Sequence, residues 1–178
     1  MQVLINSTLK TIYKNRIVPI DNIPRIRYDL LVCNRAENLS VSAKDTFHES
    51  VKRALEKEQW VITADPLKFK FGNVKFQVDL GAERLVAAER GGEKIAVEIK
   101  SFLNPSVITD FYAALGQFLS YRLGLASVEP NRKLYLAVPV DVYKTFFQSE
   151  FTQTAVQQYQ VLLIVYDPTN EVIVQWTS

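Results

Sequence analysis

Two strand-forming runs joined by a Gly-Gly step constrain the fold of this 178-residue chain more than any other feature. The runs cover residues 84–89 and 94–100, and the glycines between them at 91–92 predict a tight β-hairpin. In the second run, Glu98 and Lys100 lie two residues apart, so their side chains share one face of the sheet. The opposite face carries Ile95, Val97 and Ile99. This apolar set is expected to pack against a helix.

Helical and strand-like segments follow one another along the rest of the chain. Apolar residues recur at helical spacing in residues 42–58, 104–125, 140–149 and 152–159. Strand-forming residues dominate residues 60–63, 69–71, 74–80, 134–138, 161–166 and 172–176. Helices that alternate with strands imply an α/β fold, with a mixed sheet flanked by helices.

The chain is expected to contain one main domain, residues 42–178, preceded by an N-terminal extension, residues 1–41. The extension has apolar clusters without a sustained period, and Pro19 and Pro24 interrupt them. The six basic and three acidic residues of 1–42 leave 15 basic and 16 acidic residues in 43–178. Proteins that bind nucleic acid on their own usually carry a basic surplus. We therefore expect the domain to bind DNA weakly when it acts alone.

Cysteine usage and hydropathy indicate the compartment. Cys33 is the single cysteine, which excludes an internal disulfide framework and suits a reducing environment. No apolar run approaches the ~20 residues that span a bilayer, and the N-terminus lacks the pattern of a secretory signal. The sequence therefore predicts a cytoplasmic protein with no membrane partner.

A carboxylate pair beside a lysine is the arrangement that metal-dependent phosphodiester hydrolysis requires. Asp79 lies near the end of the strand predicted over 74–80, and Glu98 and Lys100 follow on the hairpin. The carboxylates of Asp79 and Glu98, with the backbone carbonyl of Ile99, would bind Mg²⁺ or Mn²⁺. Such a metal lowers the pKa of a bound water, and Lys100 would position that water or stabilise the charged transition state. The alternative is an ordinary solvated strand face.

Other candidate residues lie on two of the predicted helices. Gln117 and Tyr121 are four residues apart, so they share a helix face and are candidates for DNA contacts near the site. Alternatively, they are a polar residue and a half-buried tyrosine. His48 and Glu49 lie about 100° apart on the first helix, so at most one of them points at the metal. His48 is alternatively a structural histidine that is hydrogen-bonded to the region of Asp65.

Three lysines, Lys68, Lys70 and Lys75, cluster on the predicted hairpin that precedes Asp79. In a DNA-binding protein they would contact phosphate. The alternative, which the sequence favours, is a solvated strand edge whose lysines discourage aggregation.

Several motifs, in order along the chain, resemble proteins of the XisH family. They lie at residues 43–48, 54–57, 60–63 with 65–66, 78–80, 95–102, 114–118 with 121–122, and 134–139. The resemblance is collinear over residues 43–178. It implies a restriction-endonuclease-like fold, the PD-(D/E)XK fold, with Asp79, Glu98 and Lys100 as its catalytic set.

XisH proteins are known as controlling factors for excision of the fdxN element, a DNA segment removed from cyanobacterial chromosomes during heterocyst differentiation. The resemblance implies that this chain acts on DNA rearrangement with an XisI-like partner and a separate recombinase. Two functions are compatible with it. One is a metal-dependent DNA endonuclease. The other is an inactive nuclease-fold scaffold that binds the XisI-like protein and regulates a recombinase or acts in a toxin–antitoxin-like pair.

The start of the chain carries one further expectation. XisH proteins begin near the position of Ser42, so residues 1–40 have no counterpart in the resemblance. Val41 is what a GTG start codon gives when it is read as an internal codon, and we expect translation to begin there. The intact mass of the native protein checks this expectation, because a chain that includes Met1 would contradict it.

Overall fold

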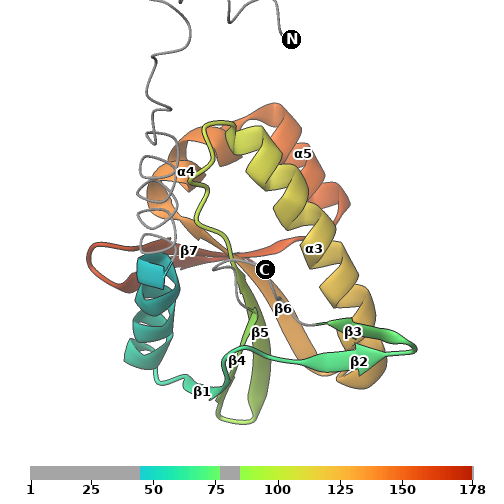
Figure 1. Ribbon diagram of the computed structural model, residues 1–178. Helices are drawn as coiled ribbons and strands as arrows, with labels where there is room; N and C mark the ends of the chain where they lie inside the picture. Colours follow the sequence, from blue (N-terminus) through green and yellow to red (C-terminus); the bar gives the residue numbers. More distant parts are fainter. Residues whose placement is uncertain (1–44, 77–84, 178) are drawn as a thin grey trace, which may run out of the picture. The chain divides into compact units, whose positions relative to one another are not determined.

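The described part of the chain forms a six-stranded mixed sheet with helices on both faces (Figure 1). This computed structural model describes residues 45–76 and 85–177. The strands are β1 (Val61–Ala64), β2 (Phe69–Phe71), β3 (Val74–Phe76), β4 (Leu85–Arg90), β5 (Glu93–Ile99), β6 (Arg132–Pro139), β7 (Leu162–Asp167) and β8 (Val172–Trp176). The helices are residues 45–57, α3 (Val107–Val128), α4 (Val140–Thr145), the 3₁₀ helix η2 (Phe146–Gln148) and α5 (Glu150–Gln158).

Strand β5 lies inside the sheet, whose order is β1-β4-β5-β6-β7-β8. It pairs with β4 antiparallel and with β6 parallel. The β4–β5 turn contains Gly91 and Gly92 at φ +56° and +87°, a backbone conformation that glycine adopts without steric cost. The predicted hairpin is therefore confirmed, and its register places Leu85 opposite Glu98.

The period-two alternation of the inner strands divides the hydrophobic core into two layers. Ala96 and Leu136 belong to the layer covered by α3, α4 and α5. Val97 and Ala137, one residue later on the same strands, belong to the layer covered by the helix over residues 45–57. The predicted packing of Ile95, Val97 and Ile99 against a helix is confirmed. The predicted α/β fold, a mixed sheet flanked by helices, is therefore confirmed.

Among the helices, the predicted boundaries of α3 and α4 differ most from the observed ones. Helix α3 begins at Val107, because the side chain of Asn104 accepts a hydrogen bond from the amide of Ser106 (3.0 Å), which becomes the N-cap. The helix predicted over 140–149 ends as α4 at Thr145 and continues as the 3₁₀ helix η2. Among the described residues, no helix has both the length and the apolar character needed to cross a bilayer.

Some predictions fall on residues that the structure does not describe. Asp79 and the second half of the strand predicted over 74–80 lie outside the described residues. The extension over 1–41 and the start at Val41 lie outside them as well. These remain predictions.

Strands β2 and β3 form a separate two-stranded sheet, which we call the β2–β3 ribbon (residues 69–76). Its Phe69 and Phe76 rings stack with centroids 4.7 Å apart, and both pack on the core layer under α3. They lie over Gly124, where an added Cβ would come within 2.5 Å of the Phe69 ring. The absence of a side chain at Gly124 therefore lets the ribbon pack directly against α3. Figure 1 shows the ribbon crossing the C-terminal part of this helix.

We expect Gly124→Ala to loosen the ribbon without unfolding the domain. The added methyl group displaces the Phe69 and Phe76 rings, while the helix gains about 1 kcal/mol from replacing glycine by alanine. Hydrogen exchange of the ribbon amides should therefore accelerate, with little change in the free energy of global unfolding. Gly116→Ala is the matched control, since nothing lies within 4 Å of a Cβ there. Equal hydrogen-exchange rates of the ribbon amides in the two variants would contradict this account.

Candidate functional site

Glu98 and Lys100 are buried at the end of β5, although both side chains are ionisable. Glu98 is 0 % exposed and Lys100 is 4 % exposed. Alternation along the strand places both on the face of Ala96, which α3 covers. The alternative of a solvated strand face is therefore wrong. Burial of a carboxylate and an ammonium costs several kcal/mol unless their surroundings compensate, so a purely structural strand would favour apolar residues here.

Asp110, in the first turn of α3, is the nearest described carboxylate partner of Lys100. The Lys100 Nζ lies 3.8 Å from its Oδ1, and its Oδ2 accepts a hydrogen bond from the amide of Asn104 (3.0 Å). The sequence reasoning missed Asp110. Its only signal was its place at a helix N-terminus, where an acid also stabilises the helix dipole. The structure thus joins β5 and α3 through this charge pair.

The backbone after Lys100 is held in an unusual conformation. Phe102 has φ +54°, a left-handed conformation that is strained for a bulky residue. The strain is offset by burial, because the Phe102 ring is 6 % exposed and meets Phe147 edge to face at 5.7 Å. The Lys100 amide also donates a hydrogen bond to the carbonyl of Ala137 (3.2 Å). Strained, over-determined backbone of this kind fixes the end of β5 beside the buried pair.

Gln117 and Tyr121 lie on the same helix that covers Glu98. Because α3 returns from the end of β5 to the start of the parallel β6, it runs opposite to β5. Gln117 lies about 10 Å along the helix from Asp110, and Glu98 lies about 7 Å along the strand from Lys100. Gln117 is therefore near the level of Glu98. Its Oε1 is buried without a hydrogen-bond partner in residues 45–76 and 85–177.

Tyr121 has a core role that the sequence left open. It is 8 % exposed, and its ring meets Phe76 of the β2–β3 ribbon at 6.1 Å. The tyrosine is thus more deeply buried than the half-buried alternative expected. It connects the helix over the candidate site to the ribbon.

The metal ligands predicted for this site are described only in part. Glu98 supplies a carboxylate whose two oxygens are both buried, and the Ile99 carbonyl is next to it in the chain. The second predicted carboxylate, Asp79, lies outside the described residues. A hard oxygen donor of this type suits Mg²⁺ or Mn²⁺. The donor chemistry of the described residues is therefore compatible with such an ion.

His48 and Glu49 lie away from this face, on the helix over residues 45–57. His48 is 2 % exposed and its Nε2 lies 3.0 Å from the Oδ2 of Asp65, whereas Glu49 is exposed. Lys52 Nζ lies 3.0 Å from the same Asp65 oxygen and 3.2 Å from Glu49. The possible ligand atoms of His48, Glu49 and Asp65 do lie close enough to one another to hold a metal ion. The Lys52 ammonium already supplies a cation there.

The Asp65 carboxyl has a shifted pKa. Burial alone would raise this pKa, but hydrogen bonds from His48 and Lys52 outweigh burial and hold the pKa below its ordinary value of 3.8. The same bond to Asp65 is the main reason that the pKa of Lys52 is raised. The Lys52–Asp65 ion pair and the His48–Asp65 hydrogen bond therefore connect the first helix to the segment after β1.

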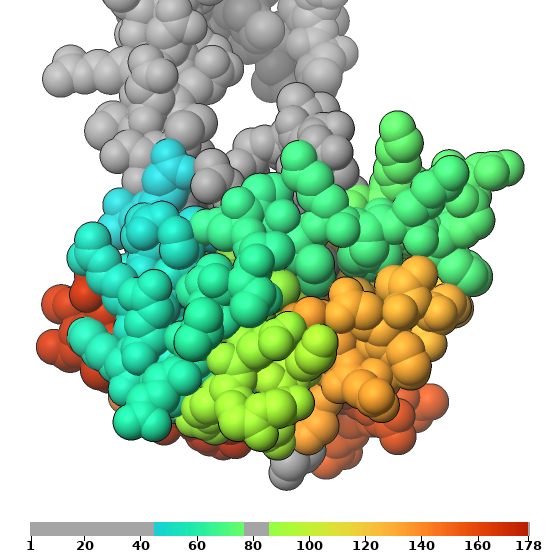
Figure 2. Space-filling view, turned by 90° about the horizontal axis from the view of Figure 1, so that it is seen from below, coloured from blue at the N-terminus to red at the C-terminus, as the bar shows by residue number. Residues whose placement is uncertain are grey.

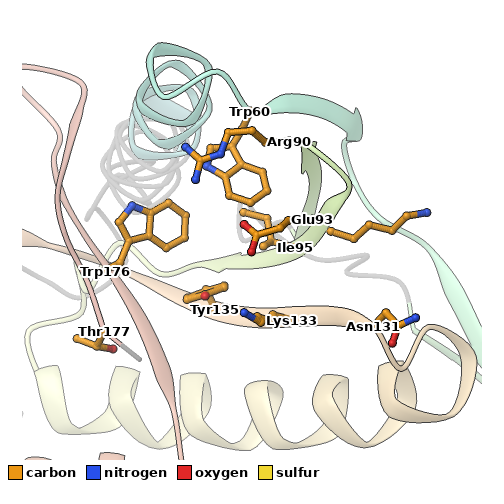
Figure 3. A pocket seen from close by; sticks show the side chains of 10 residues that line it. Trp60, Arg90, Glu93, Ile95, Asn131, Lys133, Tyr135, Trp176 and Thr177 are labelled. Atoms are coloured by element: carbon orange, nitrogen blue, oxygen red, sulfur yellow. The ribbon is translucent and has the colours of Figure 1, made fainter.

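A separate pocket of about 230 Å³ lies at the other end of β5 (Figure 3). The rings of Trp60, Tyr135 and Trp176 line it, with the two tryptophan centroids 5.9 Å apart. The Arg90 guanidinium lies 4.5 Å from the Trp60 ring centroid and donates to the carbonyl of Glu58. None of the described candidate residues lines this pocket. Its aromatic contacts hold the ends of the outer strands together.

We expect Asp65→Asn to lower the free energy of unfolding by about 1 kcal/mol at neutral pH, because His48 and Lys52 lose a charged acceptor. The native pKa of Asp65 is depressed, so its contribution exists above pH 3.8 and is lost as the pH falls through the native pKa. Urea denaturation should show that the wild type and Asp65→Asn differ less in their free energy of unfolding at acid pH than at neutral pH. Glu49 contacts the same lysine at the surface, and Glu49→Gln should lower the free energy of unfolding by less than Asp65→Asn does. A difference that does not change with pH would contradict the expectation.

Comparison with known proteins agrees with the motifs in the chain. The sequence model of one family, described as XisH protein, matches residues 41–174. A solved XisH family protein from Nostoc punctiforme PCC 73102 is 50% identical, with a TM-score of 0.70. A solved fdxN element excision controlling factor protein from Anabaena variabilis is 52% identical, with the same TM-score. Each alignment covers 75% of this chain and 99% of the other. A comparison with curated proteins finds no significant relative. The chain belongs to the XisH family.

Proposed function

We propose that this chain controls the excision of a DNA element and that it does so as a metal-dependent DNA endonuclease with a restriction-endonuclease-like site. The relative from Anabaena variabilis, described as an fdxN element excision controlling factor, supports the first part. The buried pair Glu98 and Lys100 supports the second part. An XisI-like protein is the proposed partner.

The single observation that carries the enzymatic proposal is the burial of opposite charges at a strand end. Glu98 is fully buried and Lys100 nearly so, two residues apart on the face under α3. A core selected for stability alone would not retain both residues, since replacing buried ionic groups by apolar residues of similar volume is often neutral or stabilising. Ionisable groups kept at such a cost are candidates for chemistry.

Each residue has a proposed role. Asp79, Glu98 and the Ile99 carbonyl would hold Mg²⁺ or Mn²⁺. When bound, the ion would acidify a water and neutralise charge on the phosphate. Lys100, steadied by Asp110, would place its ammonium against the phosphate or the attacking water. Gln117, whose buried Oε1 lacks a described partner, would bind near the scissile group, with Tyr121 supporting the helix.

The second candidate function is an inactive scaffold that binds an XisI-like protein and regulates a recombinase or acts in a toxin–antitoxin-like pair. The outer surface of the α3–α5 layer favours it. Tyr112 and Leu123 on α3 are 59 % and 65 % exposed, and Phe151 on α5 is 54 % exposed. Exposed aromatic and apolar groups on neighbouring helices are suited to a protein partner. A nuclease that acts in a complex would use the same surface.

The test is cleavage of supercoiled, linear and branched DNA by the full chain, with and without the XisI-like protein, in Mg²⁺ or Mn²⁺. We expect Glu98→Gln and Lys100→Gln each to lower the cleavage rate by at least about a hundredfold, since each removes a charge that acts in the transition state. Glu93→Gln is the matched control, because Glu93 is an exposed glutamate at the other end of β5. Its cleavage rate should equal that of the wild type.

Metal binding gives an independent readout. Mn²⁺ should raise the thermal unfolding midpoint of the wild type and of Glu93→Gln, but not that of Glu98→Gln. If the wild type cleaves no DNA under any condition and gains no stability from metal, the endonuclease is excluded and the scaffold becomes the better account.

A further inference from the structure

The β2–β3 ribbon has two chemically different faces. Its register pairs Phe69 with Phe76 and Lys70 with Lys75. Because side chains alternate along a strand, the phenylalanines face α3 and the lysines face away from it. The outer face of the ribbon is therefore basic.

Within the described residues, no carboxylate pairs with the lysines of the ribbon segment. Residues 66–76 contain Lys68, Lys70 and Lys75 and no acidic residue. None of these lysines forms an ion pair within residues 45–76 and 85–177, whereas Lys52, Lys57, Lys94 and Lys100 each lie within 4 Å of a carboxylate. Lys70 and Lys75 also face each other directly across the strands, an arrangement that destabilises a hairpin. A bound polyanion would reverse this unfavourable charge.

The tip of the ribbon is exposed and partly apolar. Phe71 and Val74, on either side of the Gly72-Asn73 turn, are 41 % and 57 % exposed. Gly72 has φ +58°, which lets the turn close tightly. Figure 2 shows the green side chains of this segment projecting beside orange residues at the C-terminal end of α3 and after it. A two-stranded ribbon is narrow enough to enter the DNA major groove, which is about 12 Å wide.

We propose that the β2–β3 ribbon, together with Lys68 just before it, is a contact for duplex DNA, in which Lys68, Lys70 and Lys75 neutralise backbone phosphates and the tip of the ribbon enters a groove. This inference rests on the proposed function for its choice of DNA as the polyanion. It assigns the DNA contact to a part of the chain away from the buried pair. It also replaces the interpretation of the three lysines as a solvated edge.

Helix α3 sets the distance between this contact and the candidate site. Asp110, beside Lys100, and Gly124, under the ribbon, are separated by 14 residues of helix. At 1.5 Å per residue this is about 20 Å, or about six base pairs of duplex. The ribbon would therefore contact phosphates about six base pairs from the scissile group, and a duplex much shorter than this span would lose the contact.

The test compares DNA affinity of the full-length wild type and the double variant Lys70→Gln/Lys75→Gln. A fluorescent duplex of about 20 base pairs, in EDTA to prevent cleavage, is titrated at salt concentrations from about 50 to about 200 mM. Loss of two phosphate contacts should lower the slope of log affinity against log salt by about two and weaken binding about tenfold. The thermal midpoint should not fall, because a like-charge pair is removed.

Lys57→Gln/Lys144→Gln is the matched control, with the same change in charge on the first helix and α4. Its salt slope should equal that of the wild type. Equal losses in both double variants, or no loss in either, would overturn the proposal. So would a wild type that binds no duplex at low salt, or one that binds vesicles of anionic lipid in preference to DNA.

The outcomes for the ribbon and for the nuclease are separable. A ribbon-specific loss of binding, together with a wild type that never cleaves, keeps this inference and rejects the endonuclease. Cleavage that depends on Glu98, together with unchanged binding by Lys70→Gln/Lys75→Gln, keeps the endonuclease and rejects the ribbon contact.

Discussion

The burial of Glu98 and Lys100 under α3 is the constraint on which the rest of the site depends. A carboxylate and an ammonium at 0 % and 4 % exposure must be fixed by their surroundings, because either group left without compensation would destabilise the fold. Helix α3 therefore has to lie over the end of β5 with Asp110 toward Lys100. The strained Phe102 follows from the same requirement, since the chain must turn sharply from the buried strand into the helix.

Much of the fold follows from local patterns in the sequence. The alternation in β5 and the Gly91-Gly92 turn specify the hairpin and its two faces, and these features involve only neighbouring residues. The start of α3 does not follow, because the side chain of Asn104 competes for the Ser106 amide and delays the helix. The separate sheet of the β2–β3 ribbon does not follow either. It depends on contact with Gly124, far away in the sequence.

The candidate site could be predicted by residue type but not by environment. Spacing of two places Glu98 and Lys100 on one face, yet only tertiary packing decides whether that face is covered by a helix or by water. The same holds for His48, because its position in the sequence is compatible with either a metal-ligand role or a structural role. The contact that the structure shows is with Asp65 and rests on the position of the segment after β1. Asp110 is ordinary in sequence and becomes noteworthy only beside a buried lysine.

The distribution of charge reconciles a near-neutral domain with the proposed DNA substrate. Residues 43–178 contain 15 basic and 16 acidic residues, and this balance argues against DNA binding by the domain alone. Electrostatic attraction to phosphates, however, is local, because charges further apart than about 10 Å are screened at ordinary salt. Lys52 and Lys94 are paired with Glu49 and Glu89, whereas the β2–β3 ribbon and the residue before it carry Lys68, Lys70 and Lys75 and no acidic residue. A chain of this kind would bind DNA through a small basic ribbon at one end of α3 and act on it at the other. Its affinity alone would be modest, and a partner on the exposed aromatic surface of α3 and α5 would add to it.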